Sequence, residues 1–542
     1  MNKDKELNLW KARISAGKKE FKKFHDVYKQ NLKFYIGDQL DAIPKSLSNI
    51  IAINLIFVHI QRQLPALLMA TPYFNVSPKK ENIRTDPIVV EKTLNYAYKE
   101  WKYKYPLRLA AVDAFLGLGI IKTIYNAKIV DHPLKGQPVT MNNMPILNNN
   151  GNVMTYPDEY VESESFKIKR VNPLNFIIDP ECENDYESAK WVAQKLILSY
   201  EDIKKDKKYK NTEDLVGTDD TEYMPDIPID SENTTEFKKC TLWEIYDIEE
   251  NEIKVFVETY DKWLRHEPLP DGIERHPYCI LKFYELPNKV VPLTEIGSLR
   301  GVQTEYNIAR SQILSAAKKS FRKYLTEDGV FEDEELEKLL EPYDGLVVKA
   351  NPDKMTKFIA LPDTPINPTV LENFRQIQQD FWNLAGSAEY ERGMVERRKT
   401  ATEFSGIKEY KSIVRYDKAS MVQDFVSDIM KKIIQLIQAN LSKELSFKVA
   451  GAEGEKWINI KDKAEIAGEF DIDVFIDAEQ PKTPDTEKSK LVSLMQVLTP
   501  LMQWPPLQQI LTVDPNTKMD VTEFIREIVR TFGLRDKNIM KT

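Results

Sequence analysis

The stretch NPTVLENFRQIQQDFWNL, residues 367–384, carries the pattern that decides the fold. Asn367 is a favourable helix N-cap, and Pro368 follows at the first helical position, where its missing N–H costs nothing. Apolar residues then recur at steps of four and three, which places them on one face of a helix. They are Val370, Phe374, Ile377, Phe381 and Leu384. Because the pattern stops at AGS (385–387), we predict a one-faced helix over 367–385.

A similar helix is predicted before this one, and a short insert separates the two. Residues 294–324 place apolar side chains on roughly one stripe, namely Leu299, Val302, Tyr306, Ile313, Ala317 and Phe321. The insert, 326–361, has the pattern of a short strand, an acidic helix and another strand. Two long helices around a small insert predict a hairpin-like projection. The acidic helix EDEELEKLLE (332–341) is either a solvated surface or an element that docks a partner.

A third long helix is predicted over residues 401–440. In front of it, the sequence RRKTATEF (397–404) gives Thr400 and Glu403 the spacing of a capping box, in which two side chains satisfy the first N–H groups of a helix. The segment 386–399 therefore links two long helices.

Three basic residues directly precede this capping box, where they oppose local stability. The start of a helix carries partial positive charge and favours acids. Two interpretations remain open for Arg397, Arg398 and Lys399: they contact a negative partner such as DNA, or they form ion pairs between subunits. The same segment supplies acids for such pairs, namely Glu389, Glu391 and Glu396.

Helical and β-rich stretches alternate along the rest of the chain, which predicts an α+β fold. Helices are expected at 4–32, 48–70 and 86–117, with a turn at FYIGDQ (34–39) and an extended loop at 71–80. β patterns cover 117–130, 164–180, 242–266, 457–462 and 468–479, and a helix followed by a loop is expected within 200–240. The region from Thr483 onward is expected to be helical.

Length, charge and cysteine content bound the class of protein. The 542 residues suggest three or four structural units, at about 150 residues per domain. A net charge of −8 argues against a general nucleic-acid coat, which would be basic. Cys182, Cys240 and Cys279 lack the spacing of a zinc site or a disulfide framework. The start lacks a signal-peptide core, and the most apolar stretch, 50–60, is too short to span a bilayer.

Few residue clusters could carry chemistry. Asp471, Asp473 and Asp477 fall on one strand face, and they are either a metal-dependent nuclease site or the solvent side of a half-buried strand. The histidines show no ligand spacing; they are His25, His59, His132, His266 and His276. We therefore predict no catalytic residue, no metal site and no cofactor.

A series of landmarks, taken in order, resembles the bacteriophage portal proteins, the head-to-tail connectors, over nearly the whole chain. The landmarks are a charged N-terminal helix leading to FYIGDQ (34–39), IAINLIFVHIQRQLPALLMATPYFNVSP (51–78), AAVDAFLGLGIIKTIYN (110–126), VNPLNFIIDPECENDYESAKWV (171–192), HPYCILKFYELPNKVVPLTEIGSLRGVQTEYNIARSQIL (276–314) and RRKTATEFSG (397–406). Portals of short-tailed phages are closest in pattern.

The resemblance implies a layered ring subunit with a wing, a helical stem, a small α/β clip, a tunnel loop and a C-terminal helical crown. The wing would comprise 1–292 together with the long helix and strands of 400–481. The stem would be the helices 293–324 and 367–385, on either side of the clip at 325–366. The tunnel loop would be 386–399 and the crown 482–542.

The same resemblance implies function and partners. The chain would form a dodecameric ring at a unique capsid vertex and pass double-stranded DNA, independently of base sequence, during packaging and ejection. Expected partners are terminase, head-tail adaptor proteins, and the major capsid and scaffolding proteins, with no membrane. The expected location is the virion, after assembly in the host bacterial cytoplasm. The ATPase would belong to terminase, so the chain itself is not expected to be an enzyme.

Two sets of site residues follow from the resemblance. The DNA-facing tunnel loop would present Arg392, Arg397, Arg398 and Lys399, and the clip would dock partners through Glu334, Glu335 and Glu337. An acidic chain would repel DNA from the channel wall, while a few cations at a constriction would add sequence-independent phosphate contacts. Two alternatives stay open: a metal-dependent phage nuclease that uses Asp471, Asp473 and Asp477, or another structural ring protein of the virion.

Overall fold

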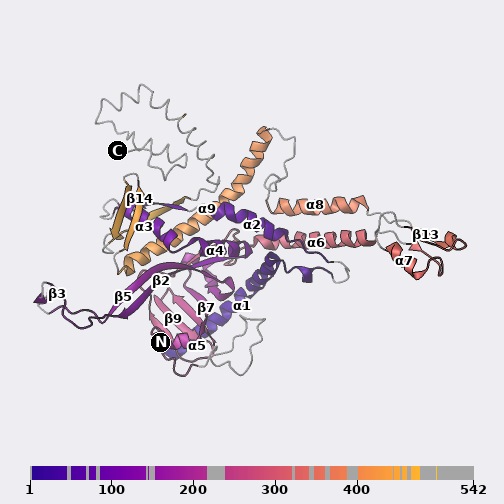
Figure 1. Ribbon diagram of the computed structural model, residues 1–542. Helices are drawn as coiled ribbons and strands as arrows, with labels where there is room; N and C mark the ends of the chain where they lie inside the picture. The colour runs from indigo at the N-terminus through magenta and orange to yellow at the C-terminus, as the bar shows by residue number, and fades with distance from the viewer. Residues whose placement is uncertain are drawn as a thin grey trace. The chain divides into compact units, whose positions relative to one another are not determined.

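The computed structural model, shown in Figure 1, describes most of the chain. The described residues are 3–44, 50–68, 72–80, 86–141, 144–145, 153–215, 239–319, 324–340, 347–360, 367–386, 401–442, 445–451, 454–460, 466–475 and 496. They form two compact units. The larger unit consists of Met1–Tyr28, Ile60–Glu295 and Gly406–Thr542, and the smaller unit of Lys29–His59 and Ile296–Ser405. Helices occur together with antiparallel sheets, so the chain is of the α+β class, as predicted.

A five-stranded antiparallel sheet belongs to the larger unit. Its strand order is β10-β9-β8-β7-β6. The strands are β6 (Phe176–Ile178), β7 (Trp191–Ser199), β8 (Lys239–Asp247), β9 (Glu252–Val257) and β10 (Arg265–Pro268). Ile203, from the short helix α5 (Tyr200–Lys205), packs with Leu242 and Val255 in an apolar cluster beside this sheet. The meander predicted at 242–266 is thereby confirmed.

A long two-stranded ribbon is the main feature of the second sheet, whose order is β11-β2-β5. Strand β2 (Gly119–Asp131) pairs along its length with β5 (Glu159–Val171), and β11 (Tyr278–Leu281) pairs only with the start of β2. The inner ends of the ribbon are buried and the outer ends are largely exposed. Figure 1 shows the ribbon leading to the small hairpin of β3 (Thr140–Met141) and β4 (Met144–Pro145).

The N-terminal helices follow the sequence pattern with one shift. Helix α1 (Lys3–Ile36) buries Trp10, Phe21 and Tyr28 along one stripe. It runs through the first part of the predicted turn at 34–39, and the turn begins at Gly37, whose φ is +93°. Residues 86–117 form a helix pair, α3 (Pro87–Glu100) and α4 (Lys104–Leu116).

The expectation of an extended loop at 71–80 was wrong. Residues Tyr73–Pro78 form strand β1, which pairs antiparallel with β16 (Phe470–Phe475) nearly 400 residues later in the chain. Phe74 and Val76 on β1 and Ile472 on β16 are buried. The residues between Pro72 and Pro78 therefore alternate between buried and more exposed positions, as in a half-buried strand. Pro78 is tolerated because it ends the strand.

The long C-terminal helix of the described chain is α9 (Ala401–Asn440), at the predicted position. It is followed by the hairpin of β14 (Leu445–Gly451) and β15 (Gly454–Ile460). Strand β14 was not predicted, and β15 and β16 correspond to the expected strands. The expected helical region from Thr483 lies outside the described residues except for residue 496.

The smaller unit contains the predicted pair of helices around an insert. Helix α6 (Glu295–Lys319) and helix α8 (Pro368–Leu384) flank β12 (Tyr324–Leu325), α7 (Asp333–Leu340) and β13 (Ile359–Ala360), and β12 pairs with β13. Figure 1 shows α8 alongside α6, and Tyr306 of α6 stacks on Phe374 of α8 with ring centroids 4.8 Å apart. Within the described residues, no helix is long and apolar enough to cross a membrane.

Candidate functional site

The basic residues proposed for the tunnel loop lie outside the described residues. This holds for Arg392, Arg397, Arg398 and Lys399, and for the capping residue Thr400. Helix α9 begins at Ala401, directly after that threonine. The start of the helix is therefore where the capping box predicted it, and the role of the basic residues stays a prediction.

The acidic residues proposed for the clip lie together on α7 but differ in their surroundings. Glu335 accepts a hydrogen bond from Lys338 Nζ at 2.8 Å and another from the Lys349 backbone N–H at 3.1 Å. The bond from Lys338 lowers the pKa of Glu335. Glu334 and Glu337 are exposed. Glu335 thus joins α7 to the backbone at Lys349, and the other two carboxylates face solvent.

A small aromatic core supports this helix within the insert. The ring of Phe358 stacks on Tyr324 at 5.0 Å and meets Phe331 edge-on at 5.1 Å between centroids. Val330 is buried. The insert is therefore a defined element with its own core.

A ladder of neutral polar side chains joins helix α6 to an extended segment in the smaller unit. Gln303, Asn307 and Ser311 are spaced by four residues and are completely buried or nearly so. Their side chains accept hydrogen bonds from alternate backbone N–H groups of residues 51–55, each at 3.0 Å. Side chains on one face of a helix thus make the backbone hydrogen bonds that a neighbouring strand would make in a sheet.

The ladder also satisfies carbonyl groups and ties in the end of α1. Gln303 Nε2 donates to the Ile53 carbonyl at 2.8 Å, and Asn307 Nδ2 donates to Gln39 Oε1 at 2.7 Å. This explains why the helix predicted over 48–70 begins later, as α2 (Leu55–Leu68), since the N–H groups of residues 51 and 53 bind the ladder and residues 50–54 have no regular secondary structure. Asn54 caps α2 by accepting from the Phe57 N–H at 2.9 Å. Sequence reasoning missed the ladder, whose signal was a run of amide and hydroxyl residues at helical spacing.

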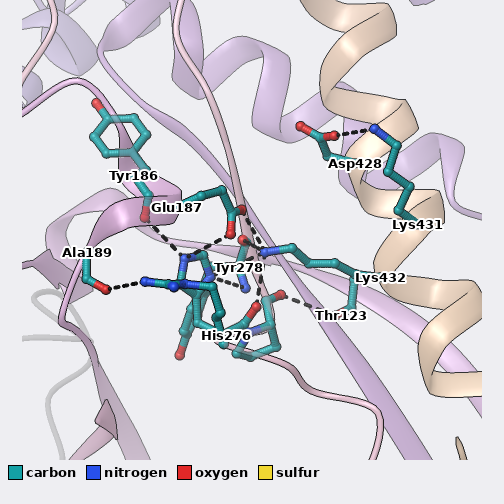
Figure 2. A network of polar contacts seen from close by, with 11 residues as sticks. Thr123, Tyr186, Glu187, Ala189, His276, Tyr278, Asp428, Lys431 and Lys432 are labelled. Atoms are coloured by element: carbon teal, nitrogen blue, oxygen red, sulfur yellow. Dashed lines mark hydrogen bonds and ion pairs between the residues drawn. The ribbon is translucent and has the colours of Figure 1, made fainter. Parts of the chain in front are cut away.

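Figure 2 shows a second polar network, which fastens α9 within the larger unit. The Lys432 ammonium donates to the carbonyls of His276 at 3.0 Å and Tyr278 at 2.9 Å, and it pairs with Glu187 at 2.9 Å. A lysine can only donate hydrogen bonds, and here it finds two carbonyls and a carboxylate. The network therefore pins the helix to the segment that leads into β11.

His276 is a buried member of this network and is held neutral. Its Nδ1 accepts from the Tyr278 N–H at 3.3 Å and faces the Lys432 ammonium at 3.4 Å, while Nε2 lies 3.3 Å from the Tyr186 carbonyl. This arrangement fits the neutral ring with its proton on Nε2. Burial, and then the charge of Lys432, lower the pKa of His276 to about 4.

A close backbone approach adds to the docking of α9. Gly272 has φ +81°, and a Cβ at this position would lie 2.9 Å from Gln435 O and from Ala439 Cβ. Only glycine fits there without strain. A cavity of about 210 Å³ beside the network is lined by residues that include Glu187, Lys431 and Lys432. Both lysines are already paired, Lys431 with Asp428 at 3.2 Å, so we assign the network to anchoring.

A buried ion pair anchors α9 nearer its start, at Lys418. Lys418 Nζ lies 2.7 Å from Glu295 Oε2, and both side chains are 6% exposed. The ammonium also donates to Gln63 Oε1 at 2.9 Å and lies 5.1 Å from the centre of the Phe115 ring. Hydrogen bonds and an aromatic face compensate the cost of burying this charge.

A cluster of two glutamates and a histidine has the residue types of a metal site. Glu6, Glu252 and His266 bring ligand atoms close together, but the Lys254 ammonium already lies 2.8 Å from Glu6 and 3.0 Å from Glu252. A cation therefore occupies the place a metal would take, which argues for a structural ion-pair cluster.

The aspartates of the alternative nuclease site fit the solvent side of a strand. Asp471 and Asp473 are exposed on β16, and Asp471 lies 3.7 Å from Lys79. Neither belongs to a group of three possible metal ligands within the described part of the chain, and Asp477 lies outside it.

Comparison with known families assigns this chain to a class of structural proteins, the phage portal proteins, which are virion components of DNA packaging and the head-tail connection. The matching family is described as Phage SU10 portal protein, and the match covers residues 122–541. The chain belongs to this family, which confirms the resemblance predicted from the sequence. The match includes both units' helices α6, α8 and α9. A comparison with curated proteins found no match.

Proposed function

We propose that this portal protein assembles as a dodecameric ring at one capsid vertex and forms the channel for DNA packaging and ejection. The match to the portal family over residues 122–541 is the observation that carries the proposal. In this role the ring docks terminase during packaging and head-tail adaptor proteins afterwards, and it sits among the major capsid and scaffolding proteins. The chain has no catalytic activity of its own, since the ATPase belongs to terminase.

We assign the parts of the ring subunit as follows. The wing is 1–292 with 400–481, the stem is 293–324 with 367–385, and the clip is 325–366. The tunnel loop is 386–399 and the crown is 482–542. The pair of one-faced helices α6 and α8 around a small insert with its own aromatic core supports the stem and clip.

Electron microscopy of the purified full-length protein tests the ring. Negative-stain images should show rings of one subunit type with a central channel, and mass photometry should give a mass near twelve subunits. Particles that remain monomeric at every concentration would refute the proposal. A parallel incubation with DNA and Mg²⁺ should give no cleavage, and metal-dependent cleavage would favour the nuclease alternative.

The basic residues of the tunnel loop are proposed to contact DNA phosphates. The dipole of α9 disfavours cations at its start, so Arg397, Arg398 and Lys399 serve local stability poorly. A ring repeats the cluster around its axis, which multiplies a weak attraction that salt reduces. Replacing all three with Ser should leave ring assembly normal and reduce packaging or the retention of packaged DNA. Normal packaging and retention would refute DNA contact, and loss of rings would favour ion pairs between subunits.

The exposed acids of the clip are proposed to meet terminase or an adaptor. Glu334→Lys with Glu337→Lys should leave rings intact and impair packaging or tail attachment. Glu335 is left unchanged in this variant because it joins α7 to the backbone at Lys349. The matched control is Glu249→Lys with Glu250→Lys, a pair of exposed acids in the larger unit. Equal packaging by both variants would refute the assignment.

A further inference from the structure

The end of α1 and the segment that leads into α2 expose several large apolar side chains in the smaller unit. We define the apolar patch as Ile36, Leu40, Ile50, Ile53 and Phe57, which are 65%, 53%, 37%, 36% and 44% exposed. Their combined exposed area is on the order of 400 Å², within the size range at which a patch on a monomer is often functional. Covering this apolar area with another surface would remove it from water and would therefore be favourable.

Polar groups hold the backbone that carries the patch. The part-buried Asn54 joins its two segments: its Nδ2 donates to the Tyr35 carbonyl at 2.8 Å and its Oδ1 accepts from the Phe57 N–H at 2.9 Å. The rings of Tyr35 and Phe57 are 5.5 Å apart. The ladder on α6 fixes the backbone of residues 51–56. A preformed surface loses little entropy on binding, which favours recognition.

The smaller unit carries a second, partly exposed apolar surface on α8. Phe381 is completely buried and Ile377 nearly so, but Val370 and Leu371, at the start of the helix, are each 40% exposed. Helix α8 packs on α6 through Tyr306. At ~100° of helix rotation per residue, the ladder residues of α6 lie on average about a quarter turn around the helix from Tyr306. The patch and the start of α8 are therefore associated with different faces of α6.

A head-to-tail contact joins two different surfaces of the subunit, and the smaller unit offers two that are apolar. A two-fold dimer uses one self-complementary patch, whereas a ring uses two distinct patches that meet between neighbours. The apolar patch would supply about half of the roughly 800 Å² that each partner gives to a standard interface. Helix α8 of the next copy would meet it with side chains of the same apolar kind.

We propose that the apolar patch of one subunit binds the start of α8 on the next copy of this chain. The inference rests on the proposed ring and concerns the residues at the contact between neighbouring subunits. Ile36, Ile53 and Phe57 are its centre on one side, and Val370 and Leu371 on the other.

The test compares three full-length proteins by mass photometry and sedimentation over a range of concentrations. The variant Ile36→Ser, Ile53→Ser, Phe57→Ser should need at least about ten times more protein for half-assembly than the wild type, as expected when central interface anchors are lost. The matched control is Ile129→Ser, Leu134→Ser, Met154→Ser, which changes exposed apolar residues of the β2–β5 ribbon region. It should assemble like the wild type.

Each outcome decides between the proposals. If the triple variant forms rings at wild-type concentrations, this inference is overturned and the proposed function stands. The same holds if the control variant has an equal assembly defect. A wild type that stays monomeric would overturn both. Circular dichroism checks that the variants fold. If the triple variant is misfolded, Ile36→Glu replaces it, since that side chain is mostly exposed in the single chain. This variant should also lose assembly, and normal assembly would overturn the contact.

Discussion

The two units fasten their long helices by different chemistry. In the larger unit, α9 uses the charged ends of Lys418 and Lys432, which donate to carbonyl and carboxylate oxygens. In the smaller unit, α6 uses the neutral side chains of Gln303, Asn307 and Ser311. An ammonium can only donate, so it suits a place where carbonyls converge. An amide donates and accepts, so it can follow a backbone that alternates N–H and C=O.

The difference predicts how each junction fails. Breaking a buried ion pair leaves a charge without its partner, and the penalty is large and depends on pH. Removing a neutral group leaves dipoles unsatisfied, at a lower cost that does not depend on pH. The following variants test this contrast, from the largest expected effect to the smallest.

Lys418→Met should cost the most, about 3–5 kcal/mol in the free energy of unfolding, because it leaves the buried Glu295 carboxylate without the opposite charge of the Lys418 ammonium. Denaturant unfolding measures the loss. The control is Lys418→Met with Glu295→Gln, which removes both charges and should recover much of the stability. If the single and double variants unfold alike, the ion pair is not what holds α9 in place.

Lowering the pH should destabilise the larger unit through His276. Its pKa in the folded state, about 4, lies below the ordinary value of 6.5, so the unfolded chain binds the extra proton between these values. Stability from this group is therefore fully present above pH ~6.5 and is lost as the pH falls toward 4, by on the order of 3 kcal/mol. Unfolding measured at several pH values checks this.

The matched variant His276→Gln should flatten that pH profile. Glutamine can still accept from the Tyr278 N–H and donate to the Tyr186 carbonyl, and it does not titrate. A profile as steep as that of the wild type would show that other groups cause the acid sensitivity.

Gln303→Leu should destabilise the smaller unit by about 2–3 kcal/mol, at every pH. The change removes the bonds of Gln303 to the N–H groups of Leu55 and Ile56 and to the carbonyl of Ile53. The Leu55 N–H and the Ile53 carbonyl keep their bond to each other at 3.1 Å, while the Ile56 N–H loses its acceptor, and a buried unsatisfied group costs roughly 1–3 kcal/mol. The control is Gln312→Leu, an exposed position on the same helix, which should change stability little. A loss confined to acid pH would contradict the neutral character of the ladder.

The helices around the insert could be predicted from the sequence because their signals are local. The cap at Asn367, the proline after it and the apolar steps to Phe381 all lie within one helix, and α8 begins and ends where they indicate. The chain at 71–80 could not be assigned in this way. Its partner strand, β16, lies almost 400 residues away, and pairing at that distance leaves no local pattern.

The hydrogen bonds and ion pairs that hold α6 and α9 could not be predicted from the sequence for a similar reason. The spacing of Gln303, Asn307 and Ser311 shows that they share a helix face, but which segment they bind depends on the tertiary fold. Lys432 and Lys418 look like ordinary solvated lysines in the sequence. Only the structure shows that the first meets two carbonyls and the second a buried glutamate.

The smallest expected effects on the free energy of unfolding come from the two asparagine N-caps of the smaller unit, which should differ from each other. Asn367 accepts from the Thr369 N–H at 3.0 Å in an exposed setting, so Asn367→Ala should cost about 1 kcal/mol. Asn54 both caps α2 and donates to the Tyr35 carbonyl, so Asn54→Ala should cost about 2 kcal/mol. Asp keeps the accepting oxygens and removes the donor. Asn367→Asp should therefore match the wild type in denaturant unfolding, while Asn54→Asp should recover only the cap. Full recovery by Asn54→Asp would show that the bond to Tyr35 adds nothing, and that the frame of the apolar patch is held by the ladder alone.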